Sequence, residues 1–324
     1  MPVEIWEREQ YYRYMVLDKI ISFLGENNIM IDLSQYKIGF DVWEGSLNID
    51  EEIIKEGGID YLIIRMNTTT GQLKLDNNFL KQWYEANNFY KFPYWVVSPL
   101  ISAQNQYDFI IKNIPLGCKI IAIDVEIVRF GVTRAGYGKV VRGLCSLLRN
   151  SGFTVIVYTG PWRYNLLDYW PSDVMYWIAG YLYSMYPPQR IFITYDVLKQ
   201  MLSRLYWIPY VAPNPTSKIS IWQTSGDRLI LPGCANRPID VNLMPIVEFE
   251  KIFGDQEIIP LPSFIPYQAE INAYVLTIRT GPGVGYAKTG KYYLYKNSVV
   301  ILEELDGWGR TDLGWISLWY TRKL

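Results

Sequence analysis

Short apolar runs with strand-like composition recur from residue 36 to 254, separated by segments of helical spacing. The runs are KIGFDV, YLIIRM, PYWVVS, KIIAIDVEIV, TVIVYTG, MYWIAGY and ISIWQTS. Between the earlier runs, apolar residues recur three or four positions apart in NIDEEIIKEGG, DNNFLKQWYEANNFY, AQNQYDFIIKN and TRAGYGKVVRGLCSLLRNSG. Strands that alternate with helices predict a parallel sheet of βα units, and seven or eight strands in about 215 residues predict a closed α/β barrel. The functional site of such a barrel lies at the carboxyl ends of its strands.

The pattern changes after residue 254. Residues 255–268, DQEIIPLPSFIPYQ, are rich in proline and lack periodicity, which indicates a linker. Residues 269–324 consist of short alternating runs separated by Gly, Pro, Asn and Asp, a pattern typical of a small all-β barrel. Residues 1–35 begin with amphipathic helical spacing, so we expect a helical extension before the α/β barrel of residues 36–254.

Two carboxylates interrupt one of the apolar runs. In KIIAIDVEIV, Asp124 and Glu126 share one side of the predicted strand, while aliphatic residues occupy the other. The two like charges would lie about 7 Å apart, which is costly in a dry core. Either the strand end opens into a polar cleft, or cations neutralise the pair. Arg65 and Arg129 are the candidate partners for a purely structural salt bridge.

The chain contains no histidine, and this restricts its chemistry. Nucleophilic systems that pair histidine with serine or cysteine are excluded, as are histidine-ligated zinc sites. The three cysteines, Cys118, Cys145 and Cys234, form no CxxC pair and no disulfide framework, which favours synthesis in a reducing compartment. If the protein is an enzyme without a cofactor, carboxylates with Tyr or Lys must transfer the protons.

Charge and hydropathy narrow the range of partners. The formal net charge is −1, which gives no indication of binding to nucleic acid or to an anionic membrane. Glu4, Glu7 and Glu9 stand where a secretory signal peptide carries basic residues, and no run reaches the roughly 18 apolar residues of a membrane span. We therefore expect no signal peptide and no membrane insertion. Aromatic residues make up 16% of the chain, and this surplus favours a sugar as the partner.

Several motifs carry a resemblance to a known family. GFDV, YLIIR, IAIDVE, and IWQTSG followed by RPIDVNLM occur in this order, with VIVYTG and YWIAGY between them. In these motifs, residues 36–254 resemble the glycoside hydrolase family 25 lysozymes, the Chalaropsis-type muramidases. TIRTGPGVGY and GWGRTDLGWI in residues 269–324 resemble a bacterial SH3 (SH3b) domain. The resemblance implies an irregular TIM-like (β/α) barrel followed by a cell-wall-binding module.

The resemblance also implies an activity. Family 25 lysozymes hydrolyse the β-1,4 bond between N-acetylmuramic acid and N-acetylglucosamine in bacterial peptidoglycan. The family's acidic residues correspond to Asp41, Asp124, Glu126 and Asp240, with Glu126 as the general acid. Repulsion from nearby carboxylates favours the protonated form of Glu126, while Asp124 would stabilise the transition state or orient the acetamido group of the substrate. No cofactor or metal is implied, and we expect a monomer.

Aromatic and polar residues near these motifs are the candidate substrate contacts. Trp222 is the preferred sugar contact, together with the neighbouring amide of Gln223. The further candidates for substrate binding are Arg65, Tyr94, Tyr158, Trp177 and Tyr181. The candidates for cell-wall binding in the SH3b-like segment are Tyr286, Trp308 and Trp315.

The chain departs from the family pattern in two places. The family usually continues the first aspartate as DVSxxQG, whereas this chain has DVWEG, and Asp32 in MIDLSQ is a rival first aspartate. Residues 182–215 form a longer segment than expected and indicate an inserted helix and loop. We therefore predict a phage endolysin or virion-associated lysin, made in the cytoplasm and released by a holin or delivered by a particle. The alternatives are a catalytically inactive wall-binding protein and a glycosidase of another polysaccharide.

Overall fold

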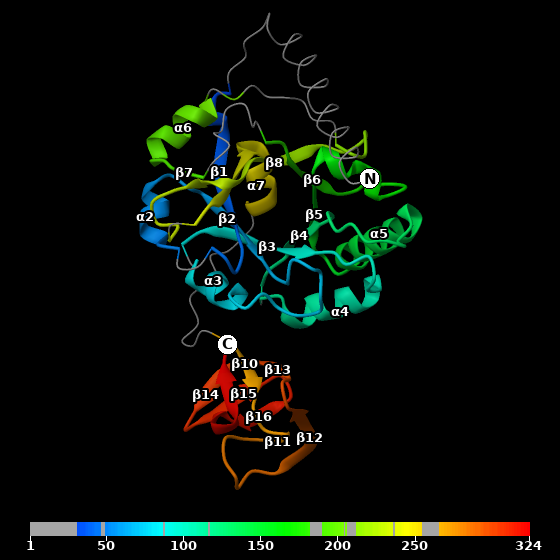
Figure 1. The fold of residues 1–324 in the computed structure, drawn as a ribbon, viewed down its shortest axis with the longest axis vertical. Coiled ribbons are helices and arrows are strands. Elements are labelled where there is room, and N and C mark those ends of the chain that lie inside the picture. The colour runs from blue at the N-terminus through cyan, green and yellow to red at the C-terminus, as the bar shows by residue number, and fades with distance from the viewer. Residues whose placement is uncertain are drawn as a thin grey trace, which may run out of the picture. The chain divides into compact units, whose positions relative to one another are not determined.

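The computed structural model describes residues 31–46, 49–86, 88–115, 117–181, 190–203, 205, 212–235, 237–254 and 266–324. The chain divides into two compact units (Figure 1). One unit holds the residues up to Lys74 together with Phe89–Glu257, and the other holds Leu75–Asn88 together with Ile258–Leu324. The predicted helix at the N-terminus and most of the predicted linker lie outside the described residues.

The first unit is a closed barrel. Its strands are β1 (Tyr36–Val42), β2 (Tyr61–Arg65), β3 (Tyr90–Val96), β4 (Ile120–Asp124), β5 (Thr154–Thr159), β6 (Met175–Ala179), β7 (Ile191–Phe192), β8 (Ile219–Ile230) and β9 (Ile239–Pro245). The strand order is β6-β5-β4-β3-β2-β1-β9-β8, and a further pairing of β6 with β8 closes the ring of eight. The short strand β7 pairs with the outer part of β8.

The barrel is parallel except at one strand. Strands β1 to β6 and β8 pair in parallel, as the alternation of strands and helices predicted. Strand β9, which was not among the predicted strand runs, runs antiparallel to both β8 and β1. Strand β8 ends at Ile230 and β9 begins at Ile239, which leaves too few residues for the crossover that a parallel pair requires.

Each of the four segments predicted to be helical between the earlier strands contains a helix. The helices are α2 (Glu51–Glu56), α3 (Phe79–Glu85), α4 (Ala103–Asn113), α5 (Arg134–Asn150), α6 (Tyr195–Ser203) and α7 (Ile246–Phe253), with short 3-10 turns η1 (Leu33–Gln35) and η2 (Pro161–Leu166). The side chains of Asp50, Ser102 and Thr133 cap α2, α4 and α5 by accepting a hydrogen bond from a backbone N–H in the first turn. Helix α6 lies in the predicted insertion, most of whose loop is outside the described residues.

Helix α7 fills the end of the barrel at which the strands begin. Phe249 and Phe253 on this helix lie 6.1 and 6.2 Å from the ring of Tyr61, at the start of β2. Phe253 also lies 5.9 Å from Phe92 on β3. Gly39 on β1 leaves room for Tyr61, because a Cβ at this position would lie 2.3 Å from the tyrosine ring. The carboxyl ends of the strands therefore form the open end of the barrel.

Strand β4 is shorter than the sequence predicted. Its ladder ends at Asp124, and the backbone N–H of Val125 donates to the carbonyl of Tyr158. Glu126 therefore lies just beyond the strand, on the connection to α5, and not within the strand as predicted. The chain leaves the sheet here because the strand has reached the open end of the barrel.

The second unit is a small β structure. Its strands are β10 (Tyr267–Ile271), β11 (Val275–Arg279), β12 (Lys288–Leu294), β13 (Ser298–Ile301), β14 (Glu303–Leu305), β15 (Trp308–Thr311), β16 (Gly314–Ser317) and β17 (Thr321–Lys323), with the 3-10 turn η3 (Leu318–Tyr320). They form two sheets, β13-β10-β17 and β12-β11-β16-β15-β14. Buried aliphatic residues such as Ile271, Ile278 and Ile301 form its core, as the alternating pattern predicted. The segment Leu75–Asn88 groups with this unit, and the amide of Gln268 donates to the carbonyl of Asp76.

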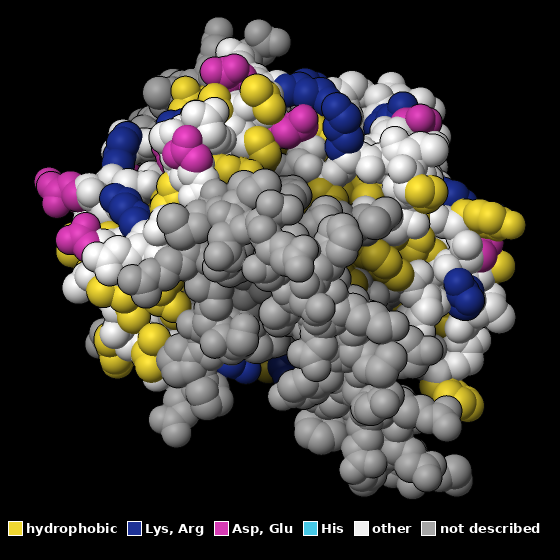
Figure 2. All heavy atoms as spheres, turned by 90° about the horizontal axis from the view of Figure 1, so that it is seen from above, with side chains coloured by type: hydrophobic (Ala, Val, Ile, Leu, Met, Phe, Trp, Pro, Cys, Tyr) yellow, Lys and Arg dark blue, Asp and Glu magenta, His cyan; other side chains and the backbone are white. Residues whose placement is uncertain are grey.

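The surface of the described residues carries charges of both signs. Figure 2 shows acidic and basic side chains interspersed on the face seen from above, without a broad area of one sign, in keeping with the net charge of −1. No helix in the described part of the chain has the length and apolar character needed to cross a membrane.

Candidate active site

A cleft of about 540 Å³ lies at the carboxyl ends of the barrel strands. It brings together all four acidic residues that the sequence singled out, Asp41, Asp124, Glu126 and Asp240. Six of the seven predicted substrate contacts also line it, namely Arg65, Tyr94, Tyr158, Trp177, Tyr181 and Gln223. Its other lining residues are Trp43, Thr69, Val96, Ile127 and Asp227.

Trp222 is the predicted contact that lies elsewhere. Successive side chains on β8 alternate between the two faces of the barrel wall, so Trp222 and Gln223 cannot both face the cleft. Gln223 points into it, whereas Trp222 is buried outside the lining and donates its indole N–H to the carbonyl of Gly180 at 2.9 Å. This placement corrects the choice of Trp222 as the preferred sugar contact.

Asp41 is held by two amides. Its Oδ2 accepts hydrogen bonds of 2.8 Å from both Gln223 Nε2 and Asn242 Nδ2. Burial raises the pKa of Asp41 from 3.8 to about 6, and the two amide donors oppose this rise. The carboxyl group of Asp41 is therefore fixed in position and loses its proton only near pH 6.

The direction of each amide is set by a further donor. Tyr158 and Tyr181 both donate to Oε1 of Gln223 at 2.7 Å, and the indole N–H of Trp177 donates to Oδ1 of Asn242 at 2.8 Å. Because these donors occupy the amide oxygens, the amide NH₂ groups must point towards Asp41. The predicted residues Tyr158, Tyr181 and Trp177 thus orient the groups that hold a carboxylate.

Asp124 and Glu126 form the acidic pair of the cleft. Asp124 is buried, and its Oδ1 accepts no hydrogen bond from the residues that the structure describes. Burial, followed by the charges of Glu126 and Asp41, raises the pKa of Asp124 well above its usual value, against the influence of Arg65. Burial also raises the pKa of the half-buried Glu126, while Arg163 opposes this rise. The pair therefore retains protons that exposed carboxylates would lose.

Asp240 is oriented by an irregularity in strand β8 at the rim of the cleft. The backbone N–H of Asp227 donates to Oδ1 of Asp240 at 2.6 Å, and Asp227 has a φ of 51°. Burial and the charge of Asp41 raise the pKa of Asp240 well above its usual value. The strained conformation of Asp227 thus supplies a donor to the fourth acidic residue.

Arg65 is a cation at the end of β2. Its guanidinium lies 3.6 Å from a carboxylate oxygen of Glu44 and 5.0 Å from the centre of the Trp43 ring. Trp43 and Glu44 are the residues with which this chain departs from the family pattern. The departure therefore places an indole and a carboxylate against the arginine that lines the cleft.

The remaining cleft aromatics pack against one another. The rings of Tyr158 and Trp177 lie 4.3 Å apart, and those of Tyr94 and Trp177 lie 6.0 Å apart in an edge-to-face arrangement. All three are buried and form the floor of the cleft.

Sequence reasoning missed several residues of the site. Asn242 is two residues from Asp240 on β9, so strand alternation alone would have placed both on the side of the cleft. Trp43, Asp227 and Arg163 gave no such signal, because Trp43 follows the end of β1, Asp227 lies in an irregular part of β8, and Arg163 lies on the 3-10 turn η2. The rival aspartate, Asp32, caps η1 by accepting from the backbone N–H and the hydroxyl of Ser34, and it does not line the cleft.

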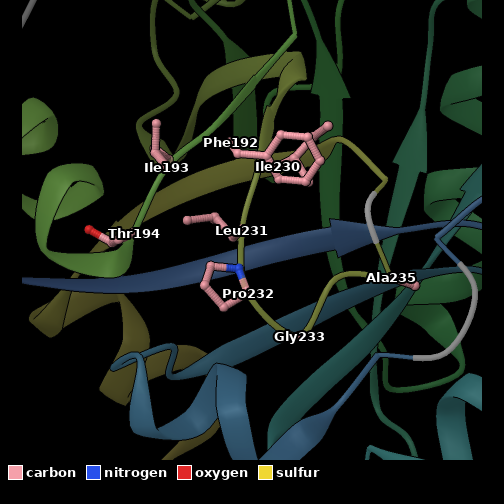
Figure 3. A pocket seen from close by; sticks show the side chains of 8 residues that line it. All are labelled: Phe192, Ile193, Thr194, Ile230, Leu231, Pro232, Gly233 and Ala235. Atoms are coloured by element: carbon pink, nitrogen blue, oxygen red, sulfur yellow. The ribbon is translucent and has the colours of Figure 1, made fainter.

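A second cavity, of about 310 Å³, lies beside β7 and the connection from β8 to β9. Figure 3 shows its lining, which is mainly apolar and includes Phe192, Ile230 and Leu231. None of the described residues that line this cavity is acidic. Within the described residues, no three Cys, Asp or Glu side chains converge closely enough to hold a metal ion.

The predicted wall-binding residues lie in the second unit. Trp308 pairs with Ser317 and Trp315 pairs with Arg310 across β15 and β16, so both tryptophans lie on one face of this sheet and are half-buried. Tyr286 is 50% exposed, in the loop between β11 and β12. The guanidinium of Arg279, which lies opposite Trp315 in the sheet, donates to the carbonyl of Tyr286.

Comparisons with known proteins identify the fold. No protein-family model matches the chain, and no curated protein matches it in sequence. The structure is similar to that of a family 25 glycosyl hydrolase from Bacillus anthracis, with a TM-score of 0.51 and 21% identity, covering 69% of this chain and 97% of that one. A bacterial lysozyme from Streptomyces coelicolor aligns at a TM-score of 0.48 and 16% identity, covering 64% and 91% of the two chains. The spore cortex lytic enzyme SleM from Clostridium perfringens aligns at 0.49 and 16%, covering 90% and 97%. The first of these comparisons confirms the predicted family 25 barrel fold.

Proposed function

We propose that the protein is a peptidoglycan hydrolase of the muramidase type, which cleaves the β-1,4 bond between N-acetylmuramic acid and N-acetylglucosamine. The observation that carries this proposal is the convergence of four acidic residues, Asp41, Asp124, Glu126 and Asp240, in one cleft at the open end of the barrel. Hydrolysis of a glycosidic bond requires a proton donor and a carboxylate that stabilises positive charge on the sugar. A cleft with several carboxylates of raised pKa supplies both.

Glu126 is the proposed general acid. It is half-buried beyond the end of β4, so a glycosidic oxygen in the cleft has access to it, whereas Asp124 lies deeper. Burial raises the pKa of Glu126, which favours the protonated form that a general acid needs. Because two neighbouring carboxyls repel each other when both are ionised, we propose that the pair shares one proton.

The other carboxylates support the reaction. Burial raises the pKa of Asp124 against the influence of Arg65; when Glu126 holds the proton of the pair, the ionised Asp124 would stabilise the oxocarbenium-like transition state or orient the acetamido group. Asp41, fixed by Gln223 and Asn242, would shape the same subsite. Asp240, the partner of Asp41 on the adjacent strand β9, would do so beside it, held by the N–H of Asp227.

The second unit is the proposed cell-wall-binding module. An exposed tyrosine and two half-buried tryptophans, Tyr286, Trp308 and Trp315, offer aromatic surface to a glycan or peptide. Together with the sequence resemblance, this arrangement supports an endolysin or virion-associated lysin that acts on the bacterial cell wall.

Digestion of purified peptidoglycan, followed by mass analysis of the fragments, tests the proposed function. We expect fragments with new reducing ends at muramic acid. New ends at N-acetylglucosamine, or free peptide termini, would assign the activity to another bond. An absence of products from several peptidoglycan types would favour the non-catalytic alternative.

A further inference from the structure

Five aromatic side chains line the described part of the cleft, and they differ in how much of the ring a ligand can reach. Tyr94, Tyr158 and Trp177 expose only 9%, 6% and 1% of their surface. Tyr181 is half-buried, and its hydroxyl is bonded to a neighbouring amide. Trp43 is 36% exposed, more than any of the others. A pyranose ring stacks on an aromatic face that it can reach, so Trp43 is the best placed of the five.

The indole of Trp43 is held in place by its neighbours. The guanidinium of Arg65 lies 5.0 Å from the ring centre, and Glu44 fixes that guanidinium by an ion pair of 3.6 Å. The backbone N–H of Ser46 donates to the carbonyl of Trp43 at 2.7 Å and closes a turn. Such a preorganised side chain loses little conformational entropy when a ligand binds.

Gly45 allows this arrangement. A Cβ at residue 45 would lie 2.4 to 2.7 Å from three atoms of the indole ring, so any other residue would displace it. The sequence WEG therefore folds as one compact turn, with the indole packed over the glycine. This turn follows directly after β1, and its Trp43 lies two residues beyond Asp41.

We propose that Trp43 is a stacking platform for one hexosamine ring of a β-1,4-linked glycan, in a subsite beside Asp41. The inference rests on the proposed function and adds a substrate-binding residue to it. The apolar C–H face of the sugar would pack on the indole, while the carboxyl groups of the cleft form hydrogen bonds at its edge. Because Trp43 stands where the resembling family has a small residue, the platform would distinguish this chain in its glycan binding.

Steady-state cleavage of soluble, peptide-free glycan by the full-length protein tests this proposal. For Trp43→Ala we expect KM to rise about tenfold while kcat stays within about threefold, because stacking acts on bound substrate and transition state alike. Gly45→Ala keeps the tryptophan but displaces its ring, so KM should rise in the same way. Tyr169→Ala is the matched control, because Tyr169 is 74% exposed in the same unit and does not line the cleft.

The outcomes separate this proposal from the proposed function. If the native protein cleaves the glycan and KM of Trp43→Ala stays within about twofold of native, the platform is wrong. The platform is also wrong if the KM of Trp43→Ala rises only for peptide-bearing glycan, because the indole then contacts the stem peptide and not the sugar. If Trp43→Ala does not fold, Gly45→Ala and Trp43→Phe decide, the latter with an intermediate KM. If the native protein cleaves nothing, the proposed function fails. Equilibrium binding of the same glycan to the native protein and to the variants then tests the stacking platform.

Discussion

At the scale of single residues, the cleft concentrates carboxyl groups. Five carboxylates line its described part, and Arg65 is the one cationic residue among the lining side chains. Burial and mutual repulsion raise the pKa of Asp41, Asp124, Glu126 and Asp240, all in the same direction. Such a cluster retains protons to a higher pH than exposed carboxyl groups do, which suits acid catalysis and lowers the stability of the folded state as the pH rises.

Replacing Glu126 tests the assignment of the general acid. Glu126→Gln keeps the shape of the side chain but removes the transferable proton, so turnover of peptidoglycan should fall about 100- to 10,000-fold with the fold intact. The rate of release of reducing ends measures the loss, and circular dichroism checks the fold. Asp32→Asn is the control, because Asp32 caps η1 outside the cleft. A Glu126→Gln rate within about threefold of native would move the acid role elsewhere, first to Asp124.

Replacing Asp41 tests the electrostatics of the cleft. The pKa of Asp41 rises from 3.8 in the unfolded chain to about 6, so the folded state binds this proton more tightly. The resulting stabilisation is fully present below about pH 4 and is lost as the pH rises through about 6; the difference is worth about 3 kcal/mol. Asn does not titrate, so Asp41→Asn should gain stability relative to native by up to that amount between pH 4 and pH 7. Thermal unfolding at both pH values measures it, and a pH-independent difference between the two proteins would contradict the prediction.

At the scale of elements, local periodicity predicted where strands and helices lie. Strands β1 to β6 and helices α2 to α5 each bury the apolar residues of one face or of a continuous run. The spacing of apolar residues in a short stretch of sequence is enough to predict such elements. The antiparallel direction of β9 depends on the length of its connection to β8. The bonds from Gln223 and Asn242 to Asp41 join residues 182 and 201 positions apart, which no local pattern encodes. The acidic residues could therefore be predicted, but the network that holds them could not.

Helix α7 provides a test of barrel packing at the end remote from the cleft. Phe253 is 1% exposed against Phe92 and Tyr61, so Phe253→Ala should cost about 3–5 kcal/mol of unfolding free energy by leaving a cavity. Val247→Ala on the same helix is the control, because Val247 is 70% exposed and should change stability by less than about 0.5 kcal/mol. Chemical unfolding followed by tryptophan fluorescence measures both. Similar losses for the two variants would show that α7 does not fill the barrel end.

At the scale of the whole molecule, the two units are not consecutive in the sequence. Residues 75–88 leave the barrel unit and group with the C-terminal unit, whereas the sequence assigned them to the barrel domain of residues 36–254. A truncation after residue 254 would therefore remove the partners of a segment that contains the buried Phe79 and Trp83. Point substitutions in the intact chain are the cleaner way to separate wall binding from catalysis.

The second unit should increase occupancy of the cell wall without supplying catalytic groups. Two linked binding units act through effective concentration, so Tyr286→Ala should weaken sedimentation with cell walls and slow their clearance at low protein concentration. Cleavage of short soluble glycan should stay unchanged, because Tyr286 belongs to the second unit and does not line the cleft. Trp319→Ala is the matched control, since Trp319 is 88% exposed in the same unit and is not one of the predicted contacts. If Trp319→Ala weakens wall binding while Tyr286→Ala does not, the binding face lies elsewhere on this unit. If Tyr286→Ala slows cleavage of soluble glycan, the proposal that the second unit binds the wall without contributing to catalysis is wrong.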